Sequence, residues 1–299
     1  MTDDDRKADL SMKKLIIFDF DGTLTDAEQE GSPFRKGYLD DIAALSNLDR
    51  DQVEVLATQY EQEVAENPGQ YGWVFQGQIV APATVDPYLR MMPVARKILD
   101  HAQALMNATD RERVLDRILY KYNYQKTIEA FRDHCGECLQ ALLDREMYIV
   151  TNSHTDAVQN KLRSLDRQRK EGQDTALSLL PLIDRVYGRA QKYVIDHTFD
   201  QLPVSLDLPG LERPVLLRRK HYFTVLNQLR EKAGVEWSDV WVFGDIFELD
   251  LSVPLSLGAQ VGLMVNRFTP QWEKDYLQNH PRGYLLDELK QVLDLIELD

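Results

Sequence analysis

The sequence predicts an α/β protein in which a parallel β-sheet core is interrupted by an inserted, mostly helical domain. Three apolar runs lack the alternation of a half-exposed strand; they read LIIF at 15–18, MYIV at 147–150 and VWVF at 240–243. Continuous apolar strands are typical of parallel sheets, because helices cover both faces. The segment 27–130 instead carries apolar residues at helical spacing, as at Tyr38 and Ile42.

The first apolar run ends abruptly in two carboxylates and a glycine, within the sequence DFDGT. Parallel sheets bind ligands at the carboxyl ends of their strands, where these residues are expected. Side chains at i and i+2 of an extended chain point to the same side, so Asp19 and Asp21 can converge on one group. Gly22 permits a tight turn and close approach by an anion, and Thr23 can hydrogen-bond within that turn.

A carboxylate pair of this kind suits phosphoryl chemistry. One carboxylate can attack phosphorus, while the other protonates the leaving oxygen and then activates water. A divalent cation would relieve the repulsion between them and neutralise the phosphate. A calcium-binding loop is the alternative, but it has its glycine at position six and follows a helix, whereas Gly22 is fourth from Asp19 and follows a strand.

The segments around this motif set the expected domain boundaries. Residues 1–12 lack the basic and apolar regions of a signal peptide, so we expect a disordered tail. The α/β core is expected at 13–26 and 131–299, and the helical insertion at 27–130. Further strands are expected near 260–266 and 284–286, before a final helix.

Two further strand ends and one helix start carry polar residues. Thr151 and Asn152 follow the second apolar run, and a hydroxyl or amide there can hold a phosphate oxygen. Lys220 opens a helical pattern. Asp245 follows the third apolar run, with Asp250 five residues later, and a carboxylate at this strand end can complete a metal site with Asp19.

These four signals, in this order, resemble the haloacid dehalogenase superfamily, whose pattern is DxDGT, then a strand-ending Thr or Ser, then Lys, then GDxxxxD. The resemblance implies a Rossmann-like core and a helical cap that closes over the site. It also implies Mg²⁺ as the cofactor. Members that cleave carbon–halogen bonds lack the second aspartate, so Asp21 indicates phosphatase or phosphomutase chemistry.

The resemblance assigns a role to each site residue. Asp19 is the nucleophile and Asp21 the general acid and base. Asp19, Asp245 and the Asp21 main-chain carbonyl bind the metal ion. The phosphate-binding groups are Thr151, Asn152, Lys220 and Gly22. The supporting residues are Asp250 and Thr23.

The lysine assignment has a rival. Lys192 also lies between the second and third apolar runs. We favour Lys220, because Lys192 is too far along the chain from Gly244 to match the family pattern.

A second insertion is expected at 188–219, between a short strand and Lys220. Its prolines and short apolar runs suggest a hairpin or an extended flap. The corresponding family segment is generally shorter. We expect this flap at the rim of the active site, where it affects substrate choice.

Composition narrows the classes of partner and compartment. The net charge of −14 argues against nucleic acid or an anionic membrane as a partner, and no apolar window reaches the length of a membrane span. Cys135 and Cys138 form an isolated Cys-x-x-Cys without a second ligand pair, which favours reduced thiols in the cytoplasm.

The sequence therefore predicts a cytoplasmic, magnesium-dependent phosphatase that acts on a small phosphorylated metabolite through an aspartyl-phosphate intermediate. A phosphomutase with the same site is one alternative. A binding or regulatory module on the same fold is the other.

Overall fold

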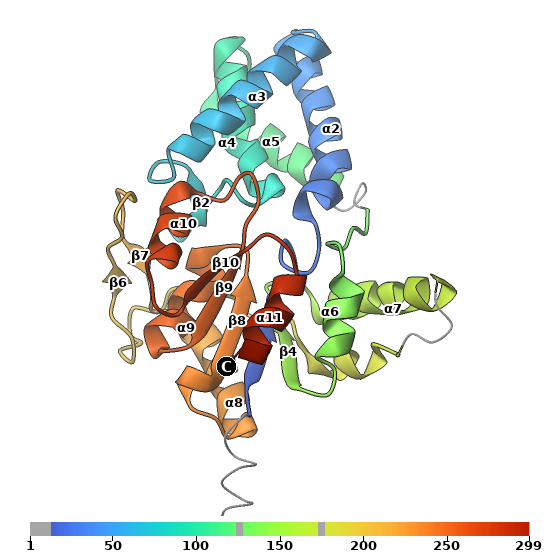
Figure 1. The fold of residues 1–299 in the computed structure, drawn as a ribbon. Helices are drawn as coiled ribbons and strands as arrows, with labels where there is room; N and C mark the ends of the chain where they lie inside the picture. Colours follow the sequence, from blue (N-terminus) through green and yellow to red (C-terminus); the bar gives the residue numbers. More distant parts are fainter. Residues whose placement is uncertain (1–12, 124–127, 173–176, 299) are drawn as a thin grey trace, which may run out of the picture.

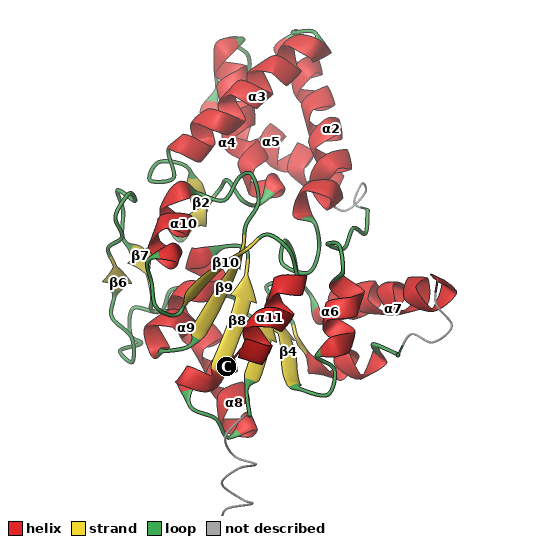
Figure 2. Cartoon of the chain, viewed as in Figure 1, coloured by secondary structure: helices red, strands yellow, loops and turns green. Residues whose placement is uncertain are grey.

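The computed structural model describes residues 13–123, 128–172 and 177–298, so the tail predicted at 1–12 lies outside the described residues. Within the described part, six parallel strands form one sheet in the order β10-β9-β8-β1-β4-β5 (Figures 1 and 2). These strands are β1 (Leu15–Phe18), β4 (Glu146–Val150), β5 (Val186–Tyr187), β8 (Val240–Gly244), β9 (Gln260–Met264) and β10 (Gly283–Leu286).

Strand β1 lies at the centre of the sheet, and all four of its residues are buried. Leu15 and Ile17 belong to one apolar cluster, whereas Ile16 and Phe18 belong to another. Alternate side chains of a strand point to opposite faces, so both faces of the sheet are covered. This arrangement confirms the predicted α/β class and explains why the apolar run shows no alternation.

Two layers of helices enclose the sheet. The first apolar cluster includes side chains of α8 (Lys220–Ala233), α9 (Ser252–Leu257) and α10 (Gln271–Gln278). The second includes side chains of α6 (Cys135–Ala141), α7 (Thr155–Gly172) and α11 (Lys290–Leu298). Cys135 and Cys138 lie in this second cluster as buried free thiols, and burial raises the pKa of both.

A helical unit with its own apolar core is inserted after β1 and lies above the sheet in Figure 1. Its helices are α2 (Ala27–Ser46), α3 (Arg50–Glu66), α4 (Pro87–His101) and α5 (Ala108–Asn123). Asp26, Asp49 and Asp86 cap the first three helices, because each side chain accepts hydrogen bonds from backbone N–H groups of the first turn.

The helical unit also contains an antiparallel hairpin that helical periodicity did not predict. Strands β2 (Gly72–Phe75) and β3 (Gln78–Pro82) pair across a turn at Gln76 and Gly77, whose φ angles are +49° and +78°. Two successive positive φ angles fit a tight two-residue hairpin turn. A small apolar cluster joins the hairpin to the α/β core. It packs Ala81 of β3 and the nearby Val85 against Ile246 and Leu249.

The segment 188–219 is mostly irregular. It contains the short antiparallel pair β6 (Ser205–Leu206) and β7 (Val215–Leu216). None of the described helices is long and apolar enough to cross a membrane.

Candidate active site

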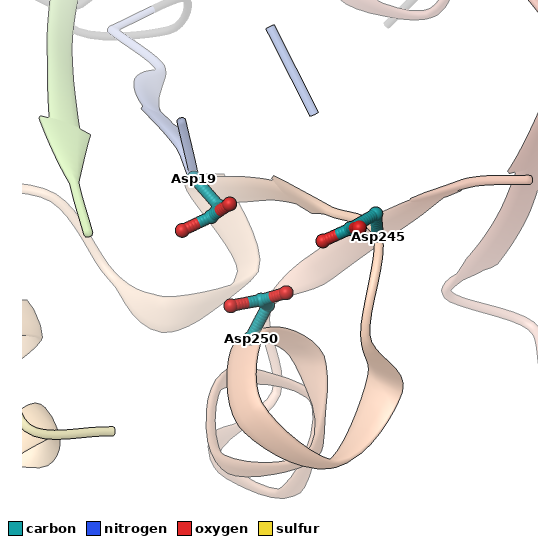
Figure 3. Close-up of side chains that lie close together, drawn as sticks. All are labelled: Asp19, Asp245 and Asp250. Atoms are coloured by element: carbon teal, nitrogen blue, oxygen red, sulfur yellow. The ribbon is translucent and has the colours of Figure 1, made fainter. Parts of the chain in front are cut away.

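Three buried carboxylates meet where β1 and β8 end. Asp19 follows β1, Asp245 follows β8, and Asp250 lies in the π-helical turn Phe247–Leu251. Each offers one oxygen, and these oxygens all lie within 4.8 Å of one another (Figure 3). The sheet brings Asp19 and Asp245 together because β1 and β8 are neighbouring parallel strands.

The turn after Asp19 requires the glycine found there. Gly22 has a φ of +82°, and a Cβ atom at this position would lie 2.0 Å from Asp245 Oδ2. Both the backbone conformation and the close approach of the carboxylate exclude a side chain. Arg132 holds the turn from outside, because its Nε and Nη2 donate to the Gly22 carbonyl at 2.9 and 2.7 Å. The predicted Thr23 donates to Asp19 Oδ2 at 3.3 Å.

Negative charge is concentrated in this cluster. Burial raises the pKa of Asp19 to about 7; Lys192 opposes this shift, and the carboxylates of Asp250 and Asp21 add to it. Burial, and then the charges of Asp250 and Asp19, raise the pKa of Asp245 well above its usual range. Oxygen ligands with excess negative charge fit a hard divalent cation such as Mg²⁺.

The lysine at the site is Lys192, so the choice of Lys220 is corrected. Lys192 Nζ lies 2.6 Å from Asp19 Oδ1 and 2.8 Å from Asp250 Oδ1, and its side chain is 1% exposed. Lys220 begins α8 at the surface, where its side chain is 58% exposed and pairs with Asp196 at 3.6 Å. The prediction was wrong because it relied on the number of residues between the lysine and Gly244. Most of the segment 188–219 lies between the two lysines and lengthens this distance along the chain, while Lys192 stays at the sheet edge.

Hydrogen bonds from backbone N–H groups hold the loop that carries Lys192. The N–H of Ala190 donates to the Thr151 carbonyl at 2.9 Å, and the N–H of Lys192 donates to Asn152 Oδ1 at 2.8 Å. Arg189 and Gln191 have φ angles of +54° and +48°, so the loop is bent twice into the left-handed region. The predicted Thr151 and Asn152 thus lie at the site, where Asn152 also positions the lysine.

Asp21, the second carboxylate of the DFDGT sequence, contacts side chains outside the three-carboxylate cluster. Ser153 Oγ donates to Asp21 Oδ2 at 2.5 Å, and Lys161 Nζ lies 3.4 Å from Asp21 Oδ1. Lys161 also reaches Glu30 Oε1, on α2 of the helical unit, at 2.8 Å. Sequence reasoning missed Lys161, because a single lysine in the polar sequence of α7 carries no motif.

Comparison with known proteins identifies the family and similar folds. A model of haloacid dehalogenase-like hydrolases matches residues 13–258. A conserved haloacid dehalogenase-like protein of unknown function from Agrobacterium tumefaciens strain C58 is 13% identical, with a TM-score of 0.51 over 96% of this chain and 98% of that chain. A predicted phosphoglycolate phosphatase from Haemophilus somnus 129PT is 15% identical, with a TM-score of 0.50 over 96% and 99%. No curated protein matches the chain.

Proposed function

Because the chain belongs to the haloacid dehalogenase-like hydrolases, we propose that it is a magnesium-dependent phosphatase. Its substrate would be a small phosphorylated metabolite, and Asp19 would carry the phosphoryl group between the two steps. The organisation of the site supports this proposal, because a nucleophile, a cation and further carboxylates converge at one edge of the sheet.

The observation that carries the proposal is the pairing of Asp19 with a buried lysine. Lys192 Nζ lies 2.6 Å from Asp19 Oδ1 and is almost fully buried. A fixed cation in a water-poor site can attract an anionic phosphoryl group to the nucleophile and stabilise the charge of the transition state. The protein carries a net negative charge and would repel an anionic substrate. The positive charge of Lys192 offsets this repulsion at the site.

The proposed reaction has two steps. An Asp19 carboxylate oxygen attacks phosphorus, the bond between phosphorus and the ester oxygen breaks, and protonated Asp21 gives its proton to that oxygen. Asp21 then accepts a proton from water, whose oxygen attacks the same phosphorus. The bond to Asp19 breaks, and inorganic phosphate leaves.

The remaining site residues have supporting roles in this proposal. Asp19, Asp245 and the main-chain carbonyl of Asp21 would hold Mg²⁺, which supplies positive charge that neutralises the phosphate. Thr151 and the backbone at Gly22 would hold phosphate oxygens. Asp250 fixes Lys192 and also closes its own turn, where its Oδ2 accepts from the N–H of Ile246 at 3.0 Å.

The test is phosphate release from sugar phosphates, nucleotides and other small esters, with and without Mg²⁺. We expect magnesium-dependent turnover that disappears in Asp19→Asn and persists in Asp144→Asn, a matched change of an exposed aspartate. Activity that survives Asp19→Asn would overturn the mechanism. Phosphorylation of Asp19 without phosphate release, detected by mass spectrometry, would instead indicate a phosphomutase.

A further inference from the structure

Arg219 is a fully buried arginine beside the loop that carries Lys192. Its side chain donates to three backbone carbonyls: Nε to Leu216 at 2.9 Å, Nη1 to Lys192 at 2.5 Å and Nη2 to Val80 at 2.8 Å. These carbonyls come from three separate segments. They belong to β7, to the lysine loop, and to β3 in the hairpin of the helical unit.

This arrangement is not explained by ion pairing. Among the ion pairs of the described residues, none includes Arg219. Burial lowers the pKa of Arg219 to about 10, although the nearby carboxylates of Glu248 and Asp250 oppose this shift, so the guanidinium is still charged near neutral pH. Burying a cation against neutral carbonyls costs free energy, and the loss of any one acceptor would leave a buried N–H group unpaired. Arg219 therefore favours the arrangement in which all three segments are seated together.

An aromatic contact joins two of the same segments independently. Tyr193 follows Lys192 directly, and its ring packs on Trp73 and Phe75 of β2, with ring centroids 4.5 and 4.9 Å apart. The hairpin of the helical unit thus contacts the lysine loop twice, through the Arg219 guanidinium and through the Tyr193 ring. Movement of the hairpin away from the core would break both contacts.

We propose that Arg219 is a positioning residue that couples the placement of Lys192 to the docking of the β2–β3 hairpin. When the hairpin is seated, Arg219 fixes the Lys192 carbonyl, and the ammonium group is held against Asp19. When the hairpin leaves, the lysine loop loses this restraint. The effect on turnover rests on the proposed phosphatase function, whereas the coupling of the two segments does not.

The first experiment measures hydrogen exchange by mass spectrometry in wild type, Arg219→Met and Arg218→Met. Arg218 is the matched control, because it is the neighbouring arginine and its Nη1 donates to His197 O at 2.8 Å, away from the hairpin. We expect Arg219→Met to speed exchange in both 72–82 and 188–196, while β1 and the Arg218→Met protein stay as in wild type. Faster exchange in only one of the two segments, or in neither, would overturn the coupling.

A second variant tests the coupling by a change in the hairpin. It also replaces Arg219→Met as the test if that variant does not fold. Coupling between two segments is reciprocal, so Trp73→Ala, which leaves Arg219 intact, should speed exchange in 188–196 as well as in the hairpin. A change confined to the hairpin would contradict the proposal.

The activity measurement uses a double-mutant cycle with Lys192. Arg219→Met should lower kcat by roughly tenfold to a hundredfold, since small displacements of a reacting group have effects of this size. In a Lys192→Met background it should lower kcat no further, because the residue acts through the lysine. Equal losses in both backgrounds would indicate a merely structural role. If wild type hydrolyses no ester, the phosphatase proposal fails, and the exchange data still decide the coupling.

Discussion

At the scale of single residues, the two candidate lysines provide a matched pair of variants. Lys192→Met removes the buried cation beside Asp19, and we expect kcat/KM to fall by about a hundredfold or more, as for other groups that stabilise transition-state charge. Lys220→Met removes an exposed ion pair and should change kcat/KM by no more than about twofold. Steady-state kinetics with one ester measures both effects, and a large loss in Lys220→Met alone would restore the assignment that the structure corrects.

Lys161 provides a test of the role of Asp21. Lys161 and Ser153 hold the Asp21 carboxylate, which is 41% exposed. If Asp21 protonates the leaving oxygen and Lys161 holds Asp21 in place, Lys161→Met should slow release of the alcohol from alkyl phosphates in the first turnover by about tenfold or more, because an alkoxide needs the proton. The same variant should release p-nitrophenolate in the first turnover nearly as fast as wild type, because nitrophenolate leaves without a proton.

The comparison between the two esters separates this role from a general loss of structure. A general loss would slow both esters equally. Lys170→Met is a control on the same helix, because Lys170 pairs with Asp166 rather than with Asp21. Equal slowing of the first turnover with both esters by Lys161→Met would show that this lysine does not act through protonation of the leaving oxygen.

At the scale of elements, the sequence predicts what a local pattern determines. The strands β1, β4 and β8 follow from continuous apolar runs, and the carboxylates at 19 and 245 follow from their places at strand ends. Neighbouring parallel strands then bring these two residues together without further information. The same reasoning places Thr151 at the site, because β4 lies on the other side of β1.

Elements that depend on distant contacts are harder to predict. Lys192 reaches Asp19 because its loop bends back at two residues with positive φ and is held by Asn152, and neither feature has a local sequence signal. The β2–β3 hairpin turns at Gln76 and Gly77, a weaker turn signal than Asn-Gly or Asp-Gly. Aromatic residues in this hairpin pack on Tyr193, far along the chain, so their spacing carries no sign of their partner.

At the scale of the whole molecule, a sheet core and a helical unit with separate apolar cores meet at the site. Buried ionisable groups lie where segments converge on the carboxyl edge of the sheet. One of them, Glu273 on α10, is fully buried; its Oε2 accepts from the N–H of Phe247 at 3.4 Å, and Oε1 has no hydrogen-bond partner among the described residues. Burial, and then the charge of Glu248, raise the pKa of Glu273 well above its usual range.

This raised pKa makes the stability of the whole fold depend on pH. In the unfolded chain Glu273 loses its proton near pH 4.5, whereas in the folded protein it keeps the proton to a higher pH. Above about pH 4.5 the folded state therefore binds a proton that the unfolded state has lost, and the free energy of unfolding falls as pH rises. Glu273→Gln is neutral at every pH and retains an acceptor for the Phe247 N–H, so this part of the decline should disappear.

Urea unfolding from pH 4 to pH 8 measures the difference. We expect Glu273→Gln and wild type to be equally stable at pH 4, and the variant to be more stable at pH 8 by about 1 to 3 kcal/mol, the usual cost of a buried polar group that lacks a partner. Glu297→Gln, a change of an exposed glutamate on α11, should leave the pH dependence as in wild type. A variant less stable than wild type at pH 8 would mean that the folded protein holds Glu273 as a stabilising anion. The pKa of Glu273 would then be lowered by folding rather than raised.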